Sequence, residues 1–485
     1  MKTLKNLLFI IGFTGIMFSC SKVEQPGFDV LDLSGRNFKS HLIVNPGVFI
    51  VEPTGGDDTP AIKQAFIDAT AFGPGSVVQL CEGEYHLGYL EVYDFYGSLR
   101  GAGKGKTVIT AIGGIDIDAL WAQHLMVCLI KFVGGDMNLS HFTIQTPPGK
   151  LSVGGPGMGH IYSLLNFSAF NAVYELGNEN RSINVVIDNV HFKGQLLEGG
   201  PGYVQGYNCL IPVRAGFDCF NPYAWSAPPV PREKIDIKIT SSEFDTFCYG
   251  LGFEGMKNSN VIIGEKNKGN IFSNFDCPGG VWESRDSKIL IEGNTFNSKA
   301  LCYGLQLDDY AYYPRLLKNE IPTKATLFNI QNNVFNLAHA YSALYLRNLR
   351  RNQYPGDIPV AFQVRNNEFN MTDGYKAIEG YRTQGMVIRN NKFSGNGDIA
   401  VYLGYNSIDG LVLGNNFSTT DLLTGAIYLV ASTRNWTIVG GNIKDRVIDL
   451  GTDNIITGVN VSTSDIPLGQ RISDNLPPMN RLMHW

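Results

Sequence analysis

Short runs of alternating apolar residues recur through the second half of the chain, and each run is broken by Gly, Asn or Asp. A phenylalanine near the end of these runs returns with a strict 24-residue step at Phe369, Phe393 and Phe417. The alternation indicates strands, because no helical periodicity lies within the repeats. A strand repeat of this length predicts a solenoid whose strands stack from coil to coil, with every second side chain filling the interior.

An asparagine stands two residues before the repeated phenylalanine. Its positions are Asn270, Asn294, Asn333, Asn367, Asn391 and Asn415. Asparagine tolerates left-handed backbone, and its amide can hydrogen-bond to the copies above and below it. We therefore interpret this column as a structural ladder at one turn of the coil.

Ahead of the repeats, a helix is predicted to begin at Asp58 or Thr59, because a capping residue is followed there by a proline. Ile62, Phe66 and Ala69 share one face of this helix. An apolar face at this place predicts that the helix covers the open end of the first coil.

The repeats, the ladder and the segments 56–66, 75–80 and 83–85 resemble the pectin-lyase-like right-handed parallel β-helix superfamily. The resemblance covers residues 45–460 and implies an all-β fold, a single-stranded right-handed parallel β-helix with an N-terminal capping helix. Residues 461–485 break the repeat and are expected to form a C-terminal cap or tail. Lyases, hydrolases, esterases and binding proteins share this fold, so the resemblance names no reaction.

The first twenty residues have the layout of an export signal, in which Lys2 and Lys5 precede an apolar run too short to span a bilayer. The small residue before Cys20 resembles the bacterial lipobox. That resemblance implies removal of residues 1–19, a lipid on Cys20, a linker over 20–44, and a place on the outer membrane or cell surface. An ordinary signal peptide with a chance cysteine, or a short N-terminal anchor, is the alternative.

Loss of residues 1–19 changes the formal net charge from −5 to −7, which argues against a nucleic-acid partner. Seven cysteines remain after Cys20, with no CxxC pair, so neither a zinc ribbon nor a redox motif is indicated. Cys209 and Cys219 are the candidates for a disulfide across a loop.

Three repeats carry an acidic residue six positions after a cysteine. The pairs are Cys248 and Glu254, Cys277 and Glu283, and Cys302 and Asp308. The next repeat has Arg347 at the equivalent position. The apolar residues expected to point inward here are Leu251, Phe253, Trp282, Leu305, Leu307, Leu344 and Leu346. Alternation along the strand then sends the three acids and Arg347 outward in one column.

Long insertions follow this strand at 309–325 and 348–359, and earlier insertions at 147–159 and 195–231 can form a second wall. Loops gathered along one edge of a solenoid usually mark its binding face. In the superfamily, the strand before the asparagine-ladder strand forms the substrate groove. The expected partner is therefore a polysaccharide or oligosaccharide.

Stacked carboxylates repel one another, and a bound cation relieves that repulsion. Glu254, Glu283 and Asp308 are therefore candidate calcium ligands, since Ca²⁺ takes carboxylate oxygens. The arrangement resembles calcium-dependent polysaccharide lyases, which implies that Arg347 clamps the substrate carboxylate and that Tyr345 is the candidate base.

Arg285, Asp309 and Tyr402 flank this column and are the candidate substrate-binding residues. An outward tyrosine such as Tyr402 can stack on a sugar ring.

Two alternatives stay open. A protonated acid beside an ionised one gives a glycoside hydrolase, for which adjacent coils suit retention and alternate coils suit inversion. Asp308-Asp309 only partly matches the Asp-Asp motif of polygalacturonase-like hydrolases, and their Gly-His-Gly motif is missing. A solvated face neutralised by Arg285 and Arg347 gives instead a non-catalytic, glycan-binding surface lipoprotein. The sequence favours a polysaccharide lyase that cleaves an acidic glycan by β-elimination.

Overall fold

The computed structural model describes residues 47–112, 128–146, 161–168, 182–195, 209–216, 233–277, 279–282, 284–298, 303–308, 323–348, 360–443, 447–458 and 461–462. All of them lie within the unit Ser40–Trp485. The predictions for residues 1–19, for Cys20 and for the linker 20–44 lie outside the described residues, as does most of the tail 461–485.

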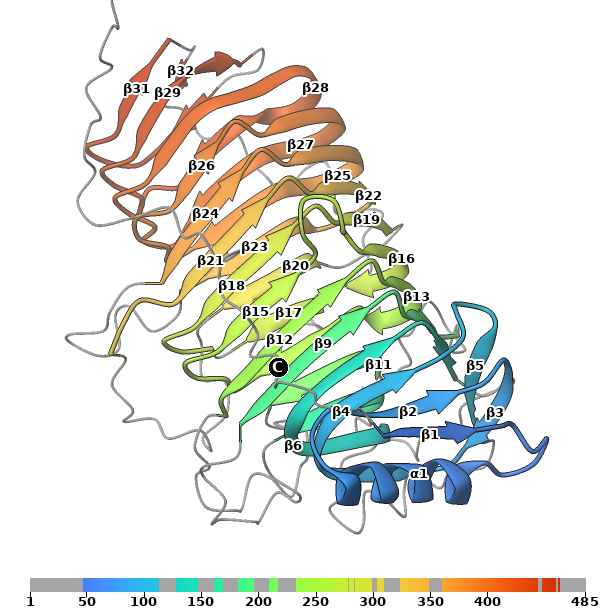
Figure 1. Ribbon diagram of the computed structural model, residues 1–485. Coiled ribbons are helices and arrows are strands. Elements are labelled where there is room, and N and C mark those ends of the chain that lie inside the picture. Colours follow the sequence, from blue (N-terminus) through green and yellow to red (C-terminus); the bar gives the residue numbers. More distant parts are fainter. Residues whose placement is uncertain are drawn as a thin grey trace, which may run out of the picture. The chain divides into compact units, whose positions relative to one another are not determined.

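All 32 described strands belong to one sheet, in which each strand pairs in parallel with a strand one coil away (Figure 1). The pairings sort the strands into three faces, which we call A, B and C. Face A holds β4 (Leu90–Arg100), β6 (Cys128–Ser140), β8 (Ile161–Ser168), β11 (Cys209–Gly216), β14 (Gly252–Glu254), β17 (Gly279–Trp282), β20 (Tyr303–Asp308), β23 (Ser342–Arg347), β25 (Glu368–Tyr381), β27 (Lys392–Gly404), β28 (Leu411–Leu429), β30 (Val447–Asp449) and β32 (Val461–Ser462).

Face B holds β1 (Val48–Val51), β2 (Ser76–Leu80), β9 (Ile183–Asp188), β12 (Ile235–Thr240), β15 (Asn260–Ile263), β18 (Lys288–Glu292), β21 (Leu327–Gln331), β24 (Ala361–Arg365), β26 (Val387–Arg389), β29 (Thr437–Asn442) and β31 (Ile455–Thr457). Face C holds β3 (Gly83–Leu87), β5 (Thr107–Ala111), β7 (Thr143–Gln145), β10 (His191–Lys193), β13 (Glu243–Tyr249), β16 (Ile271–Cys277), β19 (Thr295–Ser298) and β22 (Val334–Ala338). The long strands β4, β6, β25, β27 and β28 bend from one face into another.

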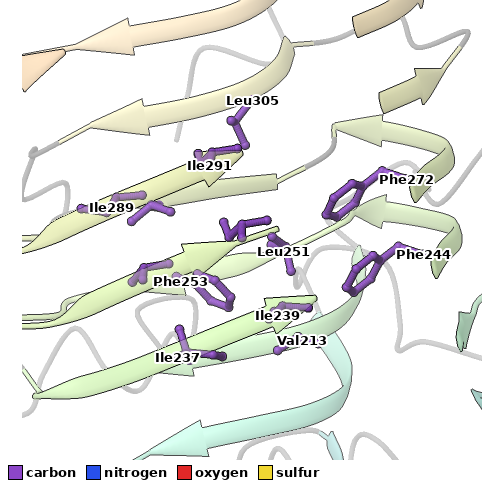
Figure 2. Packing of buried hydrophobic residues seen from close by; sticks show 14 of the residues in the cluster. Val213, Ile237, Ile239, Phe244, Leu251, Phe253, Phe272, Ile289, Ile291 and Leu305 are labelled. Carbon is purple, nitrogen blue, oxygen red and sulfur yellow. The ribbon is translucent and has the colours of Figure 1, made fainter. Parts of the chain in front are cut away.

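The interior is filled by one side chain in two from each face. Figure 2 shows part of it, with Phe244 and Phe272 of face C stacked on each other at 4.5 Å between ring centroids. The predicted inward residues Leu251, Phe253, Leu305, Leu307, Leu344 and Leu346 all lie in this core. The phenylalanines of the repeat continue the stack, and Phe369, Phe393 and Phe417 follow one another at 5.1 and 4.7 Å.

The predicted asparagine ladder is confirmed at the turn between faces B and C. Each ladder amide before the last one, Asn415, donates to the side-chain oxygen of the next asparagine at 3.0 Å and to a backbone carbonyl, as that of Asn294 does. The left-handed backbone falls on the residue before the ladder position, such as Asn332 or Gly293, rather than on the ladder residue. The ladder residues are thus selected for their amides.

The capping helix is confirmed as α1 (Thr59–Phe72), which lies at the end of the solenoid beside β1 (Figure 1). Ile62, Phe66 and Ala69 are buried against the first coils, as predicted. Asp58 occupies the N-cap position, but its carboxylate accepts from Thr54 and from the backbone of the β3 strand instead of capping the helix. In the described part of the chain, no helix is long and apolar enough to cross a membrane.

Candidate functional site

The predicted acidic column is only partly correct. Glu254 pairs in register with Trp282, one residue before Glu283, so the predicted alignment of Glu254 with Glu283 is wrong. The reason lies in the preceding strands, where Cys277 pairs with Tyr249 and not with Cys248. The cysteine spacing therefore shifted the alignment by one residue at this coil.

The same shift overturns the inward position predicted for Trp282. Val281 fills the interior, and Trp282 faces outward with its indole ring over Gly280. A Cβ at Gly280 would lie 2.1 Å from that ring, so glycine is required beneath it. Glu254 and Asp308 thus lie in one column two coils apart, with an indole between them, which spaces their backbones by roughly 9.6 Å.

The pairing of Asp308 with Arg347 in adjacent coils agrees with the prediction. Glu283 and Asp309 lie outside the described residues, and the side chain of Asp308 is not described either. Among the residues that are described, no three His, Cys, Asp or Glu side chains gather as metal ligands. Calcium binding by Glu254, Glu283 and Asp308 stays a prediction.

The candidate substrate-binding residues Arg285 and Tyr402 are both buried. Arg285 lies in a bridge with Lys257 at the turn that follows face A. Tyr402 stands in a column of outward positions on consecutive coils, after Tyr345 and Glu379 and before Tyr428. This column runs parallel to the one that carries Arg347.

Tyr345, the predicted base, packs against Arg347, whose guanidinium carbon lies 4.8 Å from the centre of the phenol ring. Burial raises the pKa of Tyr345, although Arg347 opposes the shift. The hydroxyl is therefore protonated at neutral pH, and a protonated phenol does not accept the substrate's proton. The geometry supports a contact role for Tyr345 more than a base role.

A buried ion pair lies next to these tyrosines. Lys376 Nζ is 2.8 Å from Glu379 Oε1, and the two side chains are only 3% and 6% exposed. The Oγ of Ser342 donates to the other carboxylate oxygen of Glu379 at 2.6 Å. Burial lowers the pKa of Lys376, while Glu379 acts in the opposite direction.

The column of Tyr345 and Tyr402 continues toward the N-terminal end of the solenoid. There it contains three polar residues that the sequence analysis did not predict. Lys131 of β6 pairs with Asn166 of β8, and Asn166 pairs with Arg214 of β11. We call these three residues the polar triad. The signal was available, because each of them interrupts an apolar run: Leu-Ile-Lys-Phe-Val, Leu-Leu-Asn-Phe and Val-Arg-Ala.

The triad faces outward, because its neighbours along each strand belong to the core, yet it is closed off from water. The exposed fractions of Lys131, Asn166 and Arg214 are 0%, 1% and 4%. Within the described structure, neither Nδ2 nor Oδ1 of Asn166 has a hydrogen-bond partner. An amide buried with both polar atoms unpaired costs about 1–3 kcal/mol.

Acidic and hydroxyl groups surround the triad. Glu91 pairs with Lys131 on the preceding coil and accepts hydrogen bonds from Tyr89 at 2.5 Å and Tyr93 at 2.8 Å. Burial raises the pKa of Tyr89. Glu254, the one member of the predicted column near this region, is buried two positions beyond Gly252, which pairs with Arg214.

No protein-family model and no curated protein matches the sequence. The structure is similar to PfbA, a surface adhesin of Streptococcus pneumoniae, with 16% identity, 87% of this chain and 100% of that chain covered, and a TM-score of 0.50. It is also similar to the A-module of the Azotobacter vinelandii mannuronan C-5 epimerase AlgE6, at 14% identity over 84% of this chain and 96% of that one, with a TM-score of 0.47. The catalytic unit of a GH87 α-1,3-glucanase from Streptomyces thermodiastaticus matches at 13% identity over 88% and 71%, with a TM-score of 0.44. At these identities the likeness shows the fold alone: this chain is a right-handed parallel β-helix.

Proposed function

We propose that this protein is a polysaccharide lyase that cleaves an acidic glycan on face A, with the polar triad as its reactive group. The observation that carries the proposal is Asn166, a buried amide for which the described residues offer no hydrogen-bond partner and which lies between a lysine and an arginine on successive coils. A substrate carboxylate supplies the missing partner. Such a pairing offsets the cost of burying that amide.

The triad suits the first requirement of β-elimination, which is to neutralise the carboxylate of a uronate. Arg214 offers a planar fork of donors that matches a carboxylate. Asn166 Nδ2 donates a further hydrogen bond, and its Oδ1 accepts one from a sugar hydroxyl. Because the site is desolvated, these fixed donors stabilise the charge that develops on the carboxylate more strongly than water does.

Lys131 suits the second requirement, which is a base. It lies one coil from Asn166, at about 4.8 Å between backbones, and lysines removed from water are the class from which catalytic amine bases are drawn. The amine takes the proton from the carbon next to the carboxylate. The electrons of that bond form the carbon–carbon double bond, the bond to the glycosidic oxygen breaks, and the departing oxygen takes a proton from water.

A glycoside hydrolase is the second candidate, and the column of Glu254 and Asp308 favours it. Their backbone positions are two coils apart, a separation of roughly 9.6 Å that lies near the upper end of the range for inverting enzymes. A third reading is a glycan-binding protein that cleaves nothing.

The test is the ultraviolet absorbance of the new double bond on polygalacturonate, alginate and hyaluronan, each with and without a chelator. Lys131→Arg keeps a long basic side chain but removes the base, because a guanidinium does not lose its proton, and we expect at least a 100-fold loss of kcat. Asn166→Ala removes one donor to the transition state and is expected to cost about 100-fold. Asn336→Ala, an exposed asparagine on face C, is the matched control and leaves the rate unchanged.

Other outcomes separate the candidates. Reducing sugar without absorbance contradicts the lyase and promotes the hydrolase, with Glu254→Gln as its diagnostic variant. A signal that the chelator abolishes supports the calcium prediction. Full activity in Lys131→Arg contradicts the assigned base.

We also propose that export and a lipid on Cys20 place this activity on the cell envelope, where polymeric glycans are met. The support is the N-terminal sequence alone. A Cys20→Ser variant is expected to move from the membrane fraction to the soluble fraction. An unchanged membrane fraction contradicts acylation at Cys20.

A further inference from the structure

We infer that face A carries a second glycan-binding site, formed by Tyr341, Tyr345, Tyr375 and Tyr402 around the buried pair of Lys376 and Glu379. We call it the tyrosine subsite. The inference rests on the proposed function, because it takes the same acidic glycan to reach from the polar triad to these rings.

The ammonium of Lys376 is enclosed by aromatic rings. Its Nζ lies 4.6 Å from the ring centre of Tyr341, 4.7 Å from that of Tyr375 and 4.1 Å from that of Tyr402. The ring of Tyr341 packs on that of Tyr375 at 5.1 Å, and Tyr402 stacks on Tyr428 at 5.6 Å. One cation thus fixes rings from three consecutive coils.

The fold itself does not require this ion pair. In the next coil, the positions in register with Lys376 and Glu379 hold Ile399 and Tyr402, and both of these are buried. A buried ion pair is often no more stabilising than apolar residues of similar size. Its retention at one coil therefore points to a role in holding the tyrosines in place.

The chemistry of the subsite selects its ligand. Cages of aromatic rings commonly bind quaternary ammonium ligands, but here the cage is filled by the protein's own ammonium. What remains is three half-buried phenols, those of Tyr341, Tyr345 and Tyr375, with the buried ring of Tyr402 beside them. Their apolar faces and hydroxyl edges suit the C–H faces and hydroxyl groups of a sugar.

The rim of the subsite carries two guanidinium groups, one of which, that of Arg347, is in register with Asp308 on the adjacent coil. The guanidinium of Arg347 lies over Tyr345 at 4.8 Å, and that of Arg382 lies over Tyr381 at 5.5 Å. Guanidinium groups beside aromatic rings pair with carboxylates. The favoured ligand is therefore an acidic glycan rather than a neutral one, in agreement with the triad.

The distance between the two sites follows from the register. The column passes from Asn166 through Arg214, Gly252, Gly280 and Gln306 to Tyr345. Five steps of about 4.8 Å span roughly 24 Å, and two further steps reach Tyr402 at roughly 34 Å. A glycan shorter than this span occupies one site, and a longer one occupies both.

Occupation of both sites predicts that KM falls with substrate length, because the second contact is intramolecular. The experiment measures KM on the cleaved polysaccharide and on its tetrasaccharide, for the wild type and Tyr375→Ala. We expect the ratio of the two KM values to change by at least ten-fold in the variant. Phe72→Ala, which removes an exposed ring from α1, is the control and leaves the ratio unchanged.

A second variant guards against a folding defect. Lys376→Ile with Glu379→Tyr copies the next coil, so it keeps an apolar packing that the protein already uses. If the pair positions the rings, this double variant changes the KM ratio in the same direction as Tyr375→Ala while its unfolding midpoint stays near that of the wild type. A wild-type ratio in both variants overturns the subsite.

The lyase activity and the tyrosine subsite can be tested independently of each other. If no polysaccharide is cleaved, the subsite is read by affinity electrophoresis through gels that contain alginate or polygalacturonate. Retardation of the wild type that is lost in Tyr375→Ala and kept in Phe72→Ala supports the subsite without any activity. Equal mobility of all three proteins, with and without polysaccharide, overturns it.

Discussion

Asn294 and Asn166 are both asparagines buried in columns of stacked side chains, and they differ in what surrounds them. Asn294 donates to Ile263 O at 2.7 Å and to Asn333 Oδ1 at 3.0 Å, and it accepts from both nitrogens of Asn270. Asn166, in the part of face A that is described, has no partner for either polar atom of its amide. The first amide is saturated and the second is not.

The difference comes from the neighbours. A column of identical residues satisfies itself, since each amide offers the donor that the next copy lacks. Asn166 has Lys131 and Arg214 as its neighbours in the column, and neither of these side chains is an amide that could repeat the donor-and-acceptor pairing of the ladder. Repetition therefore satisfies the amides of the ladder, whereas the described residues leave the amide of Asn166 unpaired, and we propose that a ligand completes its bonding.

The largest effect on stability is expected at Lys376 and Glu379. These residues differ in type, as those of the polar triad do, but they pair with each other, as the ladder asparagines do. Lys376→Ala leaves a buried carboxylate without its ammonium, which is expected to lower the free energy of unfolding by about 3–5 kcal/mol. Chemical denaturation measures it. A loss below about 1 kcal/mol would mean that the pair is open to water in solution.

The next effect concerns the ladder. Asn294→Ala removes the acceptor of Asn270 and a donor to Ile263, and the expected loss is about 2–4 kcal/mol. The same denaturation experiment measures it. If Asn294→Ala proved neutral, the ladder would not be the structural column that we describe.

A smaller effect of opposite sign is expected at Asn166. Asn166→Leu removes a buried amide that no described residue pairs with, so the free energy of unfolding is expected to rise by about 1 kcal/mol while activity is lost. Thermal unfolding, measured beside the absorbance assay, checks both halves. A destabilisation as large as that of Asn294→Ala would abolish the contrast between the two asparagines.

The smallest effect is expected in an exposed ladder on face C, where Asn336 donates to Asn297 and accepts from Asn370. Asn336→Ala is expected to change stability by less than about 0.5 kcal/mol, because water replaces the lost partners. This result would show that burial, and not repetition alone, gives the inner ladder its energy.

Much of the fold could be predicted from the sequence, because a repeated coil repeats its residues. The ladder and the phenylalanine stack mark each coil from Asn270 onward. In the coil before it the ladder position is Ser242, whose backbone N–H donates to Asn270 Oδ1. The earlier strands β6, β8 and β11 lack the asparagine marker, so the sequence did not predict that the polar triad lies in one column.

The candidate site was predicted less well. Its residues differ from one coil to the next, so the repeat does not align them. The alignment on Cys248 and Cys277 failed by one residue and exchanged Trp282 for Glu283. The outward positions of Tyr402 and Arg347 were predictable, because they lie in coils of regular length. The burial of Lys376 was not predictable, because it depends on rings that three separate coils supply.

The strict 24-residue repeat between Phe369 and Phe417 means that one coil can be gained or lost as a unit during evolution. Each coil contacts only the coils beside it, so duplicating or deleting one in the gene leaves the remaining interfaces intact. Such an event between the triad and the tyrosines would lengthen or shorten their separation by one step of about 4.8 Å. If a glycan binds at both sites as proposed, the number of coils between them sets the length of glycan that is preferred. A change in that number would alter this length without substituting any residue of either site.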